Sequence, residues 1–103
     1  MAGGIRLKDS AADLAIAIAL YSARTDLLPN QGLCFAGEIS LAGEIRLVKK
    51  LLLRTKMAAS SGLQAILTSD QTEKEAKDEL SSVNIAKHHC KNLQECIAKA
   101  FGK

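Results

Sequence analysis

Aromatic side chains are nearly absent from this sequence: among 103 residues there are two Phe, one Tyr and no Trp. Proteins that hold single-stranded nucleic acid by stacking bases use exposed aromatic rings for that purpose. The composition therefore argues against that mode of binding. It also predicts a core built mainly from Ala, Leu and Ile, to which Tyr21, Phe35 and Phe101 add the only rings.

Cysteine is also sparse. The three thiols, Cys34, Cys90 and Cys96, are odd in number and form no Cys-x-x-Cys pair, which argues against a disulfide framework and favours a reducing compartment. The chain has no basic start followed by an apolar core, so no signal peptide is expected. The apolar stretch 11–23 is too short to span a bilayer and predicts a helix buried on all sides. We therefore expect a cytoplasmic protein with no membrane partner.

The length and charge of the chain indicate one modest globular unit. With 103 residues, 48% apolar and 24% charged, it is expected to form a single domain or part of one, spanning residues 1–103. The net charge of +3 is unevenly distributed. Residues 1–57 hold eight Lys or Arg against five Asp or Glu, whereas residues 58–103 hold six of each.

Residues 33–48 have the pattern of a β-hairpin. The side chains of residues 33–41 alternate between two faces, as in a strand that is buried on one side. The expected buried face holds Leu33, Phe35, Gly37, Ile39 and Leu41. Ala42 and Gly43 are expected to form a two-residue connection, because Gly supplies the backbone freedom of a tight turn. The alternation then resumes from Glu44 to Val48.

Helix signals flank this hairpin. Residues 1–8 are expected to end a strand, after which Asp9 or Ser10 caps a helix that runs to about Arg24. Ser10 and Asp13 have capping-box spacing, and Asp13 suits the positive end of the helix dipole. A loop at 28–32 contains Pro, Asn and Gly. A second helix is expected over about 49–61, with Gly62 as its stop.

The second half of the chain continues the alternation. We expect a short buried strand over 63–68, a short exposed helix or a loop over 70–81 with Glu73 and Lys77 at ion-pair spacing, and a strand over 83–86. The last helix is expected to start at Asn92, with Glu95 in a capping box, and to end at Gly102. Its apolar stripe comprises Leu93, Cys96, Ile97, Ala100 and Phe101. This order of elements predicts an α/β fold in layers.

Two segments resemble a known family. The string from Phe35 to Arg46, with its repeated Gly-Glu-Ile, and the segment from Gly3 to Ala17 are similar to the C-terminal Lon-protease-like domain of RadA (Sms) DNA repair and recombination proteins. A weaker match covers 58–67, so the resemblance extends over nearly the whole chain. It implies a Lon proteolytic-domain-like fold, with a mixed sheet and a β-hairpin packed against helices.

The resemblance also implies which parts of such a protein are missing here. The domain of the family has further strands before the first matching segment, so the chain is expected to be N-terminally truncated. The sequence contains neither a four-cysteine zinc finger nor a GxxxxGK[ST] phosphate loop. ATP and zinc are therefore expected only in the upstream parts of a full-length RadA-type protein, and no cofactor or metal is expected in this chain.

Peptidase activity is not expected. A Lon-type peptidase activates a Ser nucleophile with a Lys base. The resemblance places the nucleophile position at Ala11 and the base position at Leu52, and neither side chain can do this chemistry. Ser10 is adjacent in sequence but is better placed to cap the helix. The chain is therefore predicted to be a non-enzymatic module.

A basic cluster is the main candidate site. Five cations and no acid occur within eleven residues, at Arg46, Lys49, Lys50, Arg54 and Lys56. A helix that begins near Lys49 would place Lys50 and Arg54 on one face, and Lys49 and Lys56 on another. Such cations can neutralise phosphates without reading sequence. The alternative is a solvated face with no partner. The resemblance favours DNA binding together with self-association.

Other candidate groups suggest structural roles. His88, His89, Cys90 and Cys96 have donor atoms that suit zinc but no standard spacing, and Cys96 lies on the apolar stripe of the last helix. Glu38 and Glu44 have no evident catalytic partner, so a role at a sheet face or a subunit contact is expected. Gly37 and Gly43 are expected to serve backbone geometry.

Three other functions stay open at this point. The first is a structural remnant or assembly module that binds no DNA. The second is the Lon-like domain of a magnesium-chelatase-like AAA protein, which has a similar hairpin. The last is an active serine-lysine peptidase.

Overall fold

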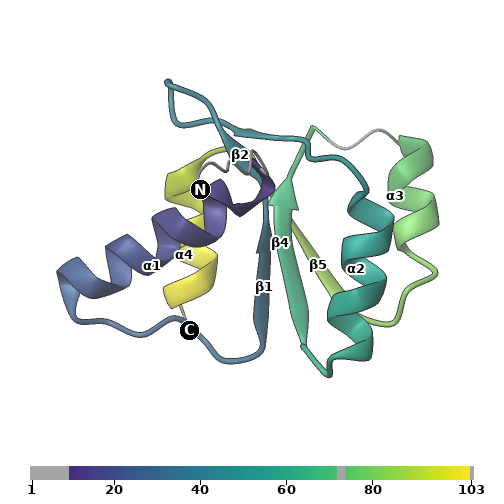
Figure 1. Ribbon diagram of the computed structural model, residues 1–103, viewed down its shortest axis with the longest axis horizontal. Helices are drawn as coiled ribbons and strands as arrows, with labels where there is room; N and C mark the ends of the chain where they lie inside the picture. The colour runs from purple at the N-terminus through teal and green to yellow at the C-terminus, as the bar shows by residue number, and fades with distance from the viewer. Residues whose placement is uncertain (1–9, 72–73, 103) are drawn as a thin grey trace, which may run out of the picture.

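The computed structural model describes residues 10–71 and 74–102. A three-stranded parallel sheet in the order β1-β4-β5 lies between two layers of helices (Figure 1). The sheet consists of β1 (Leu33–Ala36), β4 (Ala65–Ser69) and β5 (Ala86–Cys90). One helical layer holds α1 (Asp13–Thr25) and α4 (Leu93–Phe101), and the other holds α2 (Leu51–Ser60) and α3 (Lys74–Leu80). The predicted α/β class is confirmed.

The central strand β4 is buried over its whole length. Parallel sheets carry helices on both faces, so their strands are continuously apolar rather than alternating. Leu67 of β4 stands opposite Phe35 of β1 and His88 of β5 in the register. The strand predicted over 63–68 is therefore confirmed, with a shift of one to two residues.

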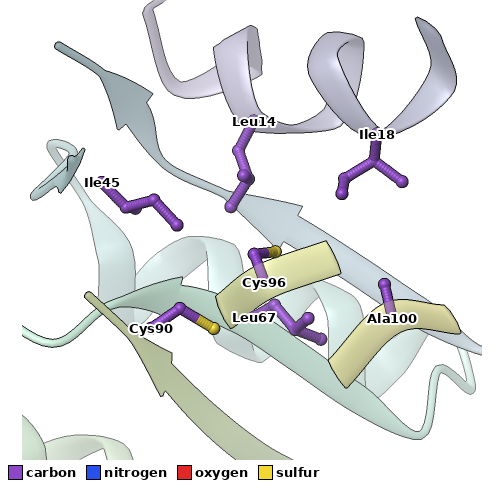
Figure 2. Packing of buried hydrophobic residues seen from close by; sticks show 7 residues of the cluster. All are labelled: Leu14, Ile18, Ile45, Leu67, Cys90, Cys96 and Ala100. Carbon is purple, nitrogen blue, oxygen red and sulfur yellow. The ribbon is translucent and has the colours of Figure 1, made fainter. Parts of the chain in front are cut away.

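Each face of the sheet has its own apolar core. The first core lies under α1 and α4 and contains Leu14, Ile18, Ile45, Leu67, Cys90, Cys96 and Ala100, all with exposures of 3% or less (Figure 2). The second lies under α2 and α3 and includes Ala36, Leu51, Ile66, Leu80 and Ile85. Successive residues of a strand point to opposite faces, and adjacent Ile66 and Leu67 accordingly belong to different cores.

The predicted hairpin is correct in its second half only. β1 belongs to the parallel sheet, where it pairs with β4, and the antiparallel hairpin is formed by β2 (Glu38–Ile39) and β3 (Ile45–Arg46). Its loop is longer than the predicted two residues: the Ser40 amide donates to the Glu44 carbonyl, and the Gly43 amide donates to the Ser40 carbonyl. Gly43 has φ +86, the left-handed conformation that closes a three-residue loop. Leu41 lies at the loop, fully exposed, and not on the buried face.

Two buried hydroxyl groups join the carboxyl end of β4 to β1 and to the hairpin. Thr68 Oγ1 donates to the Ala36 carbonyl at 2.7 Å, and Ser69 Oγ donates to the Ile45 carbonyl at 2.7 Å. The Ile45 amide in turn donates to the Lys91 carbonyl. Main-chain carbonyls of β1 and of the hairpin therefore satisfy polar side chains that would otherwise be costly to bury.

Gly37 is the point where the chain leaves β1 for the hairpin, and it has no room for a side chain. A Cβ atom there would lie 2.7 Å from Ile45 Cγ2 and 3.1 Å from Leu14 Cδ2. We expect Gly37→Ala to lower the free energy of unfolding by about 1–3 kcal/mol, because both neighbours are core residues. Urea denaturation followed by circular dichroism measures the loss. Ala42→Ser, in the exposed loop, is the control and should change it by less than about 0.5 kcal/mol.

The first helix differs from the prediction in its start and its burial. A short 3-10 turn, η1 (Ser10–Ala12), precedes α1, which begins at Asp13 with Ala12 at its N-cap and no side-chain cap hydrogen bond. Asp13 is in the first turn as predicted, but its Oδ2 accepts from the Ile39 amide at 3.3 Å. Only Leu14 and Ile18 of α1 are buried, so the prediction of a helix buried on all sides is wrong. The reason is that the described chain covers only one side of this helix.

The segment 81–90 also corrects the prediction. Val83 and Ile85 do not lie in a strand but pack in the turn after α3, against the second core. The strand instead begins at Ala86, so His88 and His89 are strand residues. The polar residues of β5 did not suggest a strand, because an edge strand can expose one of its sides to solvent.

The remaining predicted elements agree with the structure. α3 confirms the helical alternative for 70–81, and α2 ends in a Schellman arrangement in which Gly62 and Leu63 donate to the carbonyls of Ala59 and Ala58. In α4, Asn92 Oδ1 accepts from the Glu95 amide at 2.9 Å, while the Glu95 carboxylate accepts from the Lys91 amide and not from Asn92. The predicted strand over 1–8, the Asp9 cap and the Glu73–Lys77 pair lie outside the described residues.

No helix in the described part of the chain is long and apolar enough to cross a bilayer.

Candidate nucleic-acid interface

Three of the five predicted cations gather where α2 begins. Lys49 and Lys50 form the turn before the helix, and Arg54 follows in its first turn. In Figure 1, α2 starts at the end of the sheet where β4 ends, which is the usual arrangement in α/β folds. The first amides of a helix carry partial positive charge, so these cations add to an already positive region.

The arrangement of the cations differs from the predicted stripe. α2 begins at Leu51 and not near Lys49, so Lys49 and Lys50 are not on a helical face. Lys50 is the N-cap and has φ 59, in the left-handed region. Arg54 Nε donates to the Lys49 carbonyl at 2.9 Å, which holds the guanidinium against this turn. The cations therefore form a compact group around the first turn of α2.

Arg46 and Lys56 lie outside this group. Arg46 is exposed on β3 and stands directly opposite Glu38 of β2 in the register. A carboxylate at that position reduces the positive charge that Arg46 can offer to a phosphate. Lys56 is two residues from Arg54, about 200° around the helix, and so lies on the other flank of α2.

Between the two flanks, the exposed side of α2 is apolar. Leu53 and Met57 are 52% and 60% exposed and are four residues apart, on one face. The sequence pattern did not reveal this feature, because either residue could have faced the core. The buried side of α2 instead holds Leu51, Thr55 and Ala58.

Lys50 occupies a backbone conformation that suits Gly better than Lys. A side chain in the left-handed region costs about 1 kcal/mol or more, while Gly loses somewhat more entropy on folding. We expect Lys50→Gly to leave the free energy of unfolding unchanged or to raise it by up to about 1 kcal/mol, and to weaken nucleic-acid binding. Thermal melting and a binding titration on the same sample measure the two effects. A clear loss of stability would contradict the strain argument, and unchanged binding would remove Lys50 from the interface.

Cys34 of β1 packs against the second core, near enough to Arg54 to be affected by its charge. Burial raises the pKa of its thiol, and the positive charge of Arg54 opposes part of that rise. Cys34 is half-buried, whereas Cys90 and Cys96 are fully buried in the first core, where the hydrogen bond with Cys90 and burial raise the pKa of Cys96. All three cysteines are free thiols.

These environments predict an order of thiol reactivity. With 5,5′-dithiobis(2-nitrobenzoic acid) at neutral pH, Cys34 should react first and more slowly than a free thiol, because its raised pKa leaves little thiolate. Cys90 and Cys96 should react only on unfolding. The absorbance of the released thiolate counts the groups in buffer and in urea. Rapid reaction of all three in buffer would contradict the core placement.

The other candidate positions lie apart from the basic group. Ala11 is buried in η1, where its carbonyl accepts from the Gly37 amide, and Leu52 is half-buried against the second core. Glu44 is exposed and forms an isolated antiparallel bridge with Asn92, the N-cap of α4. His89 Nδ1 lies 3.2 Å from the Ser69 carbonyl. Within residues 10–71 and 74–102, no three His, Cys, Asp or Glu side chains are grouped so that they could hold a metal ion.

Comparison with known proteins identifies several relatives. A family model described as subunit ChlI of Mg-chelatase matches residues 1–72. The DNA repair protein RadA of Rickettsia felis is 41% identical over 97 residues, which cover 94% of this chain and 21% of that protein. RadA of Streptococcus pneumoniae is 34% identical over 104 residues, covering 97% and 23%. RadA of Treponema pallidum is 48% identical over 66 residues, covering 64% and 14%. The chain thus spans less than a quarter of the length of these relatives.

Proposed function

Because the chain belongs to the family described as subunit ChlI of Mg-chelatase and is homologous to the RadA DNA repair proteins, we propose that it is a non-catalytic, Lon-like module of a RadA-type protein. In this proposal it contributes sequence-independent DNA binding and self-association. The observation that carries the DNA-binding part is the group formed by Lys49, Lys50 and Arg54 at the start of α2, in a stretch from 45 to 69 without any acid.

Phosphate is the ligand chemistry that suits this group. Lys and Arg neutralise backbone phosphates and release condensed counterions, and the amides of a helix N-terminus add to the attraction. None of these contacts depends on base identity. The interface is therefore proposed to bind DNA of any sequence, with an affinity that falls steeply as salt rises.

The chain is proposed to lack enzymatic activity of its own. Ala11 and Leu52 stand at the positions that the resemblance to Lon-type peptidases gives to the Ser and Lys of the dyad, and neither carries a nucleophile or a base. ATP hydrolysis and zinc binding, where a RadA-type protein has them, are proposed to belong to other parts of such a protein.

Fluorescence anisotropy with labelled duplex oligonucleotides of two unrelated sequences tests the DNA-binding proposal. The titration is repeated from about 50 to 200 mM salt, the range over which binding through phosphates weakens most visibly. We expect equal affinities for the two sequences and a linear fall of log K with log salt. Absence of binding at the lowest salt, or a marked preference for one sequence, would overturn it.

A further inference from the structure

Two of the three cysteines lie together in the first core. Cys90 is the last residue of β5 and Cys96 lies in the first turn of α4, and both are fully buried (Figure 2). A hydrogen bond joins the two thiols. Cys34 packs against the second core, on the other face of the sheet. The protein thus holds one close pair of thiols and one separate thiol.

The turn between β5 and α4 holds the two cysteines close to one another. The Glu95 carboxylate accepts from the Lys91 amide at 2.7 Å, and Asn92 Oδ1 accepts from the Glu95 amide at 2.9 Å. The Cys96 amide donates to the Asn92 carbonyl at 3.2 Å. The sequence neighbours of the two cysteines, Lys91 and Glu95, are therefore in direct contact. These bonds tie the first turn of α4 to the end of β5.

We infer that Cys90 and Cys96 form a reversible disulfide inside the folded domain when the protein meets a peroxide. A disulfide needs two sulfurs that can approach to about 2.05 Å, from Cβ atoms roughly 4 Å apart. Two thiols in hydrogen-bond contact, on a strand end and a helix start that are tied together, suit this requirement. The inference depends neither on DNA binding nor on self-association.

The two thiols have different roles in this reaction. The hydrogen bond from Cys96 lowers the pKa of the Cys90 thiol, against the opposing effect of burial. The same hydrogen bond, together with burial, raises the pKa of Cys96. The thiolate is the form that attacks an oxidant. Cys90 is therefore oxidised first, and Cys96 closes the disulfide.

The chemistry balances with hydrogen peroxide as the oxidant. The Cys90 thiolate attacks one peroxide oxygen, the O–O bond breaks and hydroxide leaves, so Cys90 becomes a sulfenic acid. The Cys96 sulfur then attacks the Cys90 sulfur, the S–O bond breaks and a second hydroxide leaves. The protons of the two thiols convert both hydroxides to water. In total, two thiols and one peroxide give one disulfide and two water molecules, and a dithiol reductant reverses the change by exchange.

Burial makes this reaction slow and selective for small oxidants. Neither Cys90 nor Cys96 is exposed, so the first step needs a brief local opening at the start of α4. Hydrogen peroxide is small and uncharged, whereas 5,5′-dithiobis(2-nitrobenzoic acid) is large and charged at neutral pH. The pair is therefore oxidised by peroxide in the folded protein, although it resists the larger reagent.

Mass spectrometry of the full 103-residue chain tests the inference. The folded protein is treated with hydrogen peroxide, then unfolded in urea with iodoacetamide and digested with trypsin. Trypsin cuts after Lys91, between the two cysteines, so we expect the peptides 88–91 and 92–99 joined together and separated again by dithiothreitol. In the matched control Cys34→Ala the same joined peptides should form, and the number of alkylated thiols should fall from two to none.

Two single variants test the assigned roles. Cys96→Ala should leave Cys90 as a sulfenic acid, which dimedone traps, whereas Cys90→Ala should give no dimedone product at Cys96. Equal trapping in both variants would overturn the order of the two steps.

The wild type decides the inference itself, and circular dichroism verifies that it stays folded during the treatment. If Cys90 and Cys96 can still be alkylated after peroxide, or if either is found joined to Cys34, the inference is wrong. It is equally wrong if the disulfide forms only as the far-UV spectrum of the folded protein is lost. DNA binding is measured separately, by anisotropy, and does not depend on any of these outcomes.

Discussion

Replacing Lys49, Lys50 and Arg54 together with Gln should weaken DNA binding about 100-fold at low salt and reduce the slope of log K against log salt by about 3. Each phosphate contact that is lost removes about 0.9 from that slope, because one fewer counterion is released on binding. The loss should be the same for unrelated DNA sequences, since phosphate contacts carry no sequence information. Anisotropy titrations at several salt concentrations measure both quantities.

A matched variant separates the local effect from the change in net charge. Lys77, Lys91 and Lys99 are exposed and lie outside the basic group, so replacing all three with Gln also lowers the net charge from +3 to zero. This control should retain most of the affinity. Equal losses in the two variants would mean that overall charge, and not this group, drives binding. Replacing Arg54 also removes its hydrogen bond to the Lys49 carbonyl and so disturbs the start of α2. The double variant with Gln at positions 49 and 50 keeps this bond, so a loss of DNA affinity in that variant comes from the two lost charges.

Leu67→Ala should lower the free energy of unfolding by about 2–5 kcal/mol, a large part of the stability of a domain of this size. Leu67 is fully buried in the middle of the central strand and belongs to the core under α1 and α4 (Figure 2). Its neighbours in the register are residues of β1 and β5, whose backbones are fixed by the sheet and cannot move into the space. The substitution therefore leaves a cavity rather than a repacked core.

Urea unfolding monitored by circular dichroism measures this loss, with Leu41→Ala as the matched control. Leu41 is fully exposed at the hairpin loop, so its truncation should change the free energy of unfolding by less than about 0.5 kcal/mol. A loss below about 1 kcal/mol for Leu67→Ala would mean that the core beneath α1 is loosely packed.

Local sequence patterns predicted the elements that depend on local chemistry. The cap at Asn92 and the stop at Gly62 each satisfy backbone groups within a few residues, so they can be recognised without knowledge of the fold. The buried strand β4 could also be recognised locally, from its run of apolar residues. The exception is β5, whose polar side chains give no strand pattern because it lies at an edge of the sheet.

Predictions that depended on tertiary neighbours were less accurate. The apolar alternation of residues 33–41 continues without a break, yet the chain leaves the parallel sheet at Gly37. At this point Gly37 packs closely against Ile45, and an alternation pattern carries no information on such a tertiary contact. The burial of α1 was overestimated for a related reason: an apolar residue such as Leu20 marks a face that needs a partner but does not say whether the chain itself provides one.

The sequence indicated a candidate region but not the arrangement of its side chains. A run of cations without acids singled out Arg46 to Lys56 as the candidate, and whether these residues bind a ligand stays a prediction. The grouping around the first turn of α2 depends on the left-handed conformation of Lys50 and on the bond from Arg54 to the Lys49 carbonyl. Neither has a signal in the sequence, because Lys seldom adopts that conformation.

The two hydroxyl groups at the end of β4 have a consequence for where this protein can act. Proteins with parallel sheets commonly hold their ligands beyond the carboxyl ends of the strands. Here the hairpin of β2 and β3 lies at that end: Ser69 Oγ donates to the Ile45 carbonyl of β3, while Thr68 Oγ1 donates to the Ala36 carbonyl at the end of β1. Moving the hairpin away would break the bond from Ser69 to Ile45 and take Ile45 out of the first core, whereas the bond from Thr68 lies within the parallel sheet. While the hairpin stays in this position, we expect ligands of this chain to bind at its outer surfaces, such as the basic group at the start of α2, rather than beyond the carboxyl ends of the strands.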